Sequence, residues 1–75
     1  MFYFEVNNMD LKKSLRLALA HEGIKKSQLA ERLDTSSQQV SNWLRTGKMK
    51  QSSIEDVSAA FNMSVSQFIA LGENS

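Results

Sequence analysis

The chain has 75 residues, of which 41% are apolar, and its formal net charge is +1. This length supports one small hydrophobic core. The sequence contains no cysteine and a single histidine, His21, which excludes disulfide bonds and multi-histidine metal sites. We therefore expect no metal and no cofactor. No apolar run approaches the roughly 18 residues of a membrane span, and we expect no secretory signal and no membrane partner.

Charge is distributed unevenly along the sequence. Residues 25–51 contain six lysines and arginines against two carboxylates, whereas residues 52–75 contain three carboxylates and no lysine or arginine. A nearly neutral chain with a basic middle can turn one positive face toward a polyanion. Because the excess of basic over acidic residues is small, an ordinary surface of mixed charge is the alternative interpretation.

The first eight residues favour an extended conformation. Phe2, Phe4 and Val6 alternate with other residues, which is the period of a β-strand, and Tyr3 adds a further aromatic ring. Because a lone strand cannot satisfy its own backbone groups, two arrangements are open. The segment packs its aromatic side chains on the domain, or it pairs with the same segment of a second subunit.

Five helices are predicted over residues 9–72. The first begins after a cap at Asn8 or Asp10 and ends at Gly23. Its apolar side chains recur with the spacing of one helix face, at Leu11, Leu15, Ala18 and Leu19.

The next two predicted helices are short and close together. The second covers about residues 27–33, with the apolar stripe Leu29, Ala30 and Leu33. The third covers about residues 37–45, because Ser36 and Gln39 form a capping-box pattern and Gly47 provides a stop. Its apolar stripe is Val40, Trp43 and Leu44. We expect the tryptophan to lie in the core, since an aromatic ring at this position fills the space between helices.

Two further capping-box patterns open the last two helices. Ser52 with Glu55 precedes the stripe Ile54, Val57 and Phe61. Ser64 with Gln67 precedes the stripe Val65, Phe68, Ile69 and Leu71, and Gly72 is predicted to end the fifth helix. Each capping pattern stands directly before an apolar stripe. This agreement between the signal for a helix start and the helical spacing of apolar residues supports the prediction of these helices.

The second and third helices have the layout of a helix-turn-helix, with a turn at residues 34–36. In such a unit the second helix buries one stripe and presents a polar outer face to the major groove of DNA. The outer face predicted here is uncharged and rich in hydrogen-bonding groups, and it consists of Ser37, Gln38, Gln39, Ser41 and Asn42. Glutamine and asparagine amides combine a donor and an acceptor, which matches adenine N6 and N7, and serine can donate or accept.

Two segments carry a family resemblance: residues 23–33, Gly-Ile-Lys-Lys-Ser-Gln-Leu-Ala-Glu-Arg-Leu, and residues 36–43, Ser-Ser-Gln-Gln-Val-Ser-Asn-Trp. They resemble the helix-turn-helix of the Cro and lambda-repressor family. Residues 54–65 are similar to the fourth helix of that family and the entry to its fifth. The resemblance covers about residues 9–72, and residues 73–75 are left as a tail.

The resemblance implies an all-α, compact five-helix domain that binds a double-stranded DNA operator, usually as a homodimer. In this family the first, second and sixth positions of the third helix read base edges. Here those positions are Ser37, Gln38 and Asn42, with Gln39 beside them. We expect phosphate contacts from five further residues, which set position and salt dependence and not sequence preference: Lys26, Gln28, Arg45, Lys48 and Lys50.

The sequence departs from the family pattern at two places in the helix-turn-helix. The family often has Thr-Gln at the start of the second helix, with the glutamine on the DNA backbone, whereas this chain has Lys25 and Lys26. That contact would become a charged one. The usual glycine of the turn is replaced by Asp34, which tolerates a left-handed backbone less easily than glycine.

The resulting hypothesis is a small transcriptional repressor of the Cro type, phage or prophage-like, in the cytoplasm of a bacterial or phage-infected cell. Two alternatives are open: the DNA-binding part of a longer repressor, and an antitoxin or adaptor that uses the same fold to hold a protein partner. The apolar residues 2–4 favour the second of these. We do not expect this protein to be an enzyme or to bind a small-molecule substrate, since the sequence has no glycine-rich phosphate loop and no clustered metal ligands.

Overall fold

A computed structural model describes residues 10–73 of the chain. All regular elements in this range are α-helices, which confirms the predicted all-α class. They are α2 (Leu11–Glu22), α3 (Lys26–Leu33), α4 (Ser37–Thr46), α5 (Gln51–Ala60) and α6 (Val65–Glu73). The predicted extended segment at residues 1–8 lies outside the described residues.

The start and end of α2 are set by the residues that the sequence indicates. The side chain of Asp10 accepts a hydrogen bond from the backbone N–H of Lys13 at 3.1 Å, which satisfies one of the unpaired donors of the first turn. Gly23 has a φ of 65°, and the chain leaves the helix there. The N–H of Ile24 reaches back to the carbonyl of Leu19, which is the pairing of a Schellman motif.

The helix α3 begins one residue earlier than predicted, at Lys26. The side-chain oxygen of Gln28 accepts a hydrogen bond from the backbone N–H of Lys25 at 2.8 Å and so fixes the first turn. At its end Asp34 adopts a left-handed φ of 56°, a conformation that few residues other than glycine, asparagine and aspartate adopt. The N–H of Thr35 bonds to the carbonyl of Ala30 at 2.9 Å and closes the turn.

One of the three predicted capping boxes is complete, and a second is present in part. The hydroxyl of Ser36 accepts from the backbone N–H of Gln39 at 3.1 Å at the start of α4. Before α6, the hydroxyl of Ser64 accepts from the N–H of Gln67, and the Gln67 side chain accepts from the N–H of Ser64, so this capping box is complete.

The predictions for the start of α5 and the end of α6 were wrong. Lys50 is the cap residue of α5 and has no side-chain hydrogen bond in that role, while Ser52 lies inside the first turn. Gly72 does not end α6, which continues to Glu73. This glycine is buried against the start of α2, where its backbone N–H donates to the hydroxyl of Ser14 at 3.0 Å.

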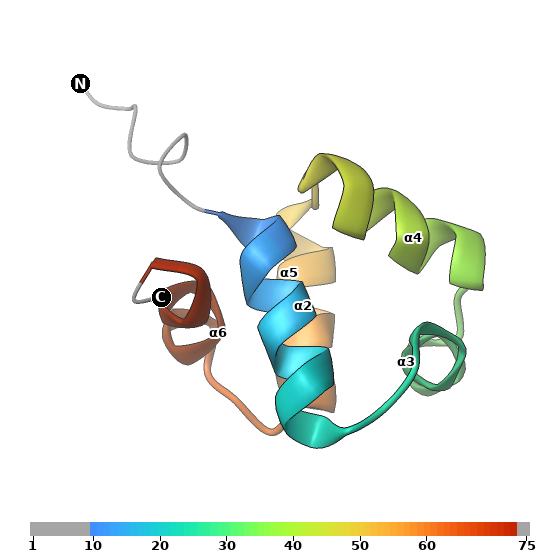
Figure 1. Cartoon of the computed structure of the whole chain (residues 1–75), viewed down its shortest axis with the longest axis horizontal. Helices are drawn as coiled ribbons and strands as arrows, with labels where there is room; N and C mark the ends of the chain where they lie inside the picture. The colour runs from blue at the N-terminus through green and yellow to red at the C-terminus, as the bar shows by residue number, and fades with distance from the viewer. Residues whose placement is uncertain (1–9, 74–75) are drawn as a thin grey trace.

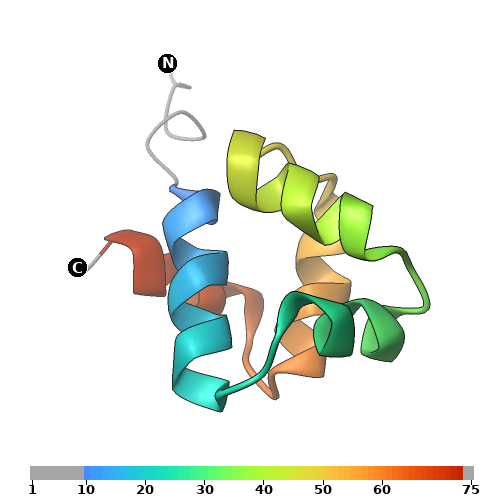
Figure 2. The ribbon, with the colours of Figure 1, turned by 45° about the vertical axis from the view of Figure 1, so that its right-hand side comes forward.

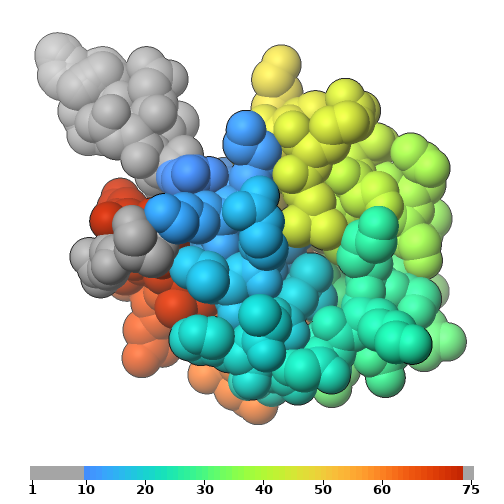
Figure 3. Space-filling view, in the orientation of Figure 1, coloured from blue at the N-terminus to red at the C-terminus, as the bar shows by residue number. Residues whose placement is uncertain are grey.

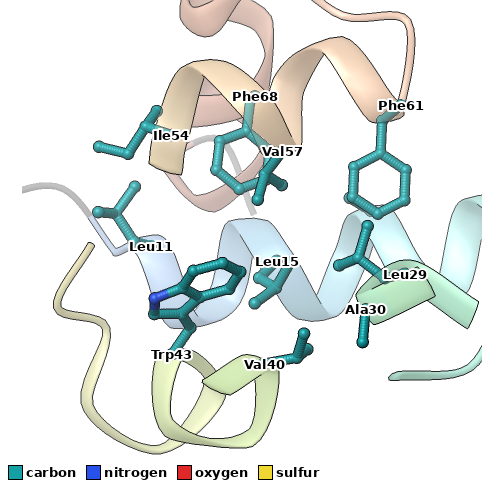
Figure 4. Close-up of a cluster of buried hydrophobic side chains, with 11 residues drawn as sticks. Leu11, Leu15, Leu29, Ala30, Val40, Trp43, Ile54, Val57, Phe61 and Phe68 are labelled. Carbon is teal, nitrogen blue, oxygen red and sulfur yellow. The ribbon is translucent and has the colours of Figure 1, made fainter. Parts of the chain in front are cut away.

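The five helices share one core. Figure 4 shows Val40 and Trp43 of α4 pointing toward Leu15 of α2, with Val57 and Phe68 on the other side of that leucine. Trp43 is 7% exposed, as its predicted core position requires. The buried apolar set spans every helix: Leu11, Leu15, Ala18, Leu29, Ala30, Val40, Trp43, Ile54, Val57, Phe61 and Phe68.

The arrangement leaves α3 and α4 together on one side of the molecule. α2 packs against α6 and α4, while α3 packs against α4 and α5 (Figure 1). Figure 2 shows α3 below α4, with the short turn between them at the edge of the molecule. Over residues 10–73, no helix has the length and apolar character needed to cross a bilayer.

Candidate DNA interface

The helix α4 divides cleanly into a buried and an exposed side. Val40 is fully buried, and with Trp43 it anchors α4 on the core. Residues Ser37, Gln38 and Gln39 are exposed, and Asn42 is half-buried. The helix α4 lies at the surface of the molecule (Figure 3). The predicted outer face is therefore accessible at these four positions, whereas its fifth residue, Ser41, is half-buried beside Lys26 of α3.

Three side chains form the ridge of α4 opposite the core. Gln38, Asn42 and Arg45 are spaced i, i+4 and i+7, which places them on one line along a helix. The Nε2 of Gln38 donates to the Oδ1 of Asn42 at 3.2 Å. The Nη2 of Arg45 donates to the same oxygen, also at 3.2 Å. The two amides and the guanidinium are thus held in one hydrogen-bonded chain.

Ser37 and Gln39 lie beside this ridge in the first turn. Ser36 supplies the capping hydroxyl, so capping does not occupy the side chain of Ser37. Both Ser37 and Gln39 are exposed at the end of α4 nearest the turn. The structure therefore brings the four predicted base-reading residues to one surface of one helix.

On the side toward α3, a lysine bridges the two helices. The Nζ of Lys26 donates to the hydroxyl oxygen of Ser41 at 3.2 Å. This bond places the positive charge of the first residue of α3 beside the outer face of α4. Gln28 is also exposed here, and its side-chain oxygen accepts from the backbone N–H of Lys25.

The remaining predicted cations lie at the other end of α4. Lys48 and Lys50 are exposed in the segment that joins α4 to α5. The hydroxyl of Thr46 donates to the carbonyl of Asn42 at 2.8 Å and accepts from the backbone N–H of Lys48 at 3.2 Å, which shapes this segment. Positive side chains therefore stand beside the uncharged face, at Lys26, and beyond the C-terminal end of α4, at Lys48 and Lys50.

One cation of the basic middle of the chain lies elsewhere. The guanidinium of Arg32 reaches the carbonyl of Ala60 at 3.4 Å, at the end of α5. A cation near the C-terminus of a helix also interacts favourably with the helix dipole. Arg32 therefore ties α3 to α5 and does not belong to the surface around α4.

Sequence reasoning missed two contacts of this surface. It assigned Arg45 to phosphate alone, although the i, i+3 spacing from Asn42 is visible in the sequence and predicts a contact within the helix. The Lys26–Ser41 bond joins two helices, and no local pattern predicts it.

Within residues 10–73 no three side chains of the His, Cys, Asp or Glu type come together in a way that could hold a metal ion. His21 is exposed near the end of α2, as expected for a surface residue.

Comparison with known proteins agrees with this geometry. Residues 14–72 match the model of the Cro/C1-type HTH DNA-binding domain. The chain is also similar to the repressor protein CI of Enterobacteria phage phi80, with 32% identity over 65 residues. That alignment includes 87% of this chain and 27% of the phage protein, so the chain spans about a quarter of the relative's length. No solved structure matches at a comparable level of significance. The match over most of the chain, together with the helix-turn-helix formed by α3 and α4, establishes that the chain belongs to the Cro/C1-type helix-turn-helix DNA-binding domain family.

Proposed function

We propose that the protein is a sequence-specific DNA-binding repressor that inserts α4 into the major groove of an operator. The observation that carries this proposal is the uncharged, hydrogen-bonding face of α4, exposed opposite Val40 and Trp43 and flanked by lysines and arginines. The major groove presents a distinct set of donors and acceptors for each base pair, and side-chain amides and hydroxyls can read that set.

The residues divide into two roles in this proposal. Base edges are contacted by Ser37, Gln38, Gln39 and Asn42. Phosphates are contacted by Lys26, Gln28, Arg45, Lys48 and Lys50. Phosphate contacts supply affinity through counterion release and hold α4 in register, while contacts to base edges supply the sequence preference.

Two subunits are expected on each operator. One recognition helix reaches only a few base pairs, and each good bidentate contact contributes about 1–3 kcal/mol of discrimination. Useful operator specificity is about 4–10 kcal/mol, and a second copy of α4 on the operator would bring the summed discrimination toward the upper part of that range. A homodimer on a two-fold operator would place its half-sites about 34 Å apart, one turn of DNA.

Selection of bound sequences from a random DNA pool tests the proposal. A two-fold symmetric consensus with half-sites about one helical turn apart is the expected result. Equal binding of all sequences would contradict sequence-specific recognition. A consensus with a single half-site would support sequence-specific recognition and contradict binding as a homodimer.

The similarity to the phage repressor favours repression over activation, because the relative's name identifies it as a repressor. We propose the same role for this domain when it occupies a promoter. A reporter gene behind the selected operator checks this: expression should fall when the protein is produced, and an increase would indicate an activator.

A further inference from the structure

We propose that Arg45 is a positioning residue that fixes the direction of the Asn42 amide, and through it the direction of the Gln38 amide, before DNA is bound. This inference rests on the proposed function, because it assigns the bases that the ridge of α4 accepts. It gives Arg45 a role in sequence preference in addition to its proposed contact with phosphate.

The first step is the chemistry of the three groups. A guanidinium has five N–H donors and no acceptor. The Asn42 atom that lies 3.2 Å from Nη2 of Arg45 must therefore be the oxygen, since an NH₂ group there would place two donors against each other. The assignment of the amide then follows from its partner and not from its shape alone.

In the second step, the orientation of the Asn42 amide determines the orientation of the Gln38 amide. Gln38 approaches the same Oδ1 of Asn42, so it must do so with its own NH₂ group, at 3.2 Å. Oδ1 has two lone pairs, and these two donors occupy both. The Asn42 oxygen is thus saturated within the protein.

The third step concerns what the ridge shows to a base pair. With its oxygen occupied, Asn42 presents only the donors of its Nδ2 group. It therefore favours acceptors in the major groove, and guanine presents two of them side by side, O6 and N7, whereas adenine N7 and thymine O4 are single acceptors. This differs from the adenine preference expected from an unconstrained asparagine, because the pairing with adenine N6 needs the oxygen that Arg45 and Gln38 hold.

Gln38 keeps both kinds of group. One hydrogen of its Nε2 is donated to Asn42, and its Oε1 and the second hydrogen of Nε2 remain for DNA. An acceptor beside a donor matches adenine N6 and N7. The ridge therefore combines one adenine-matching position at Gln38 with one acceptor-seeking position at Asn42.

The experiment compares Arg45→Met with the matched control Lys48→Met. Both variants remove one exposed positive charge near the end of α4. Only the first removes the donor to Asn42. Base preference at each operator position is measured by competition binding, and the position read by Asn42 is identified as the one whose preference is lost in Asn42→Ala.

For Lys48→Met we expect weaker binding to all DNA and an unchanged consensus. For Arg45→Met we expect the same general loss together with a roughly tenfold fall in discrimination in favour of guanine at the Asn42 position. In an Asn42→Ala background, Arg45→Met should change no base preference further, because its effect passes through Asn42. Thermal unfolding of each variant checks that the fold is retained, and both positions are exposed.

Two results would overturn the inference while leaving the proposed function intact. One is a consensus with an A·T or T·A pair at the position read by Asn42. The other is an Arg45→Met variant that loses affinity and keeps the full base preference. Absence of any consensus for the unmodified protein would instead contradict the proposed function itself.

Discussion

Neighbouring side chains of α4 differ in role because the helix turns each one toward a different environment. Val40 points into the core, Ser41 faces Lys26 of α3, and Asn42 lies on the outer ridge. A substitution on the ridge is therefore expected to alter DNA recognition and to have little effect on stability. Substitutions at the surface usually change the free energy of unfolding by less than about 0.5 kcal/mol.

Gln38→Ala tests this separation directly. The variant loses the amide that we propose contacts a base, so preference at one operator position should relax by about 1–3 kcal/mol. Its affinity for random DNA should remain similar, because that affinity depends on phosphate contacts. Competition binding with single-base operator variants measures the effect. If operator and random DNA lose affinity equally, Gln38 does not read a base.

Lys48→Ala addresses the phosphate contacts. Removal of one such contact should weaken binding to all sequences and reduce the slope of log affinity against log salt by about one unit. Arg32→Ala is the matched control, because Arg32 is engaged at the end of α5 and should leave the slope unchanged. An unaltered slope for Lys48→Ala would remove that residue from the interface.

At the scale of helices, short sequence patterns predicted most starts and stops, because capping joins residues only three positions apart. The patterns at Ser36 and Ser64 predicted hydrogen bonds that the structure contains. The pattern at Ser52 failed, since the extended conformation that precedes α5 belongs to Lys50 and the helix has already begun at Gln51. A capping pattern identifies residues that can cap a helix, and the surrounding fold decides which residue does.

The cap of α4 is expected to matter more than its single hydrogen bond suggests, because this helix carries the proposed interface. Ser36→Ala removes the acceptor for the N–H of Gln39 and should lower the free energy of unfolding by about 1 kcal/mol. Ser37→Ala is the control, since it lies one residue later and does not cap the helix. Urea unfolding measures both, and equal stability of the two variants would show that the cap contributes nothing.

The site was only partly predictable at this scale. The outer face of α4 follows from spacing within one helix, so Ser37 to Asn42 could be assigned from the sequence. The contact between Lys26 and Ser41 depends on how α3 and α4 cross, which is set by the left-handed turn at Asp34 and by core packing. Patterns within a single helix carry no information about such crossings.

Across the whole molecule, a close contact joins the first and last described helices. Ser14 is fully buried, and its hydroxyl accepts from the N–H of Gly72 at 3.0 Å and lies 3.3 Å from the carbonyl of Ile69. A methyl group at Gly72 would overlap the backbone carbonyl of Asp10 and lie 2.6 Å from the Ser14 oxygen. The glycine is therefore required by the approach of two helices and not by a stop signal.

Gly72→Ala should destabilise the protein even though alanine favours helix more than glycine does. The overlap with backbone atoms of α2 forces the helices apart, at a cost of about 1–3 kcal/mol, which exceeds the gain in helix propensity of about 1 kcal/mol. Ser66→Ala in the same helix is the control, because Ser66 is exposed and should tolerate the change. A raised melting temperature for Gly72→Ala would contradict the close approach.

The position of α6 also has a practical consequence. This helix packs on α2 and α5, and α4 lies across the molecule from it (Figure 1). A fluorophore attached at the exposed Glu73 would therefore sit well away from the ridge of Gln38, Asn42 and Arg45. Such a label would report tumbling of the bound complex without occupying the surface that we propose contacts nucleic acid.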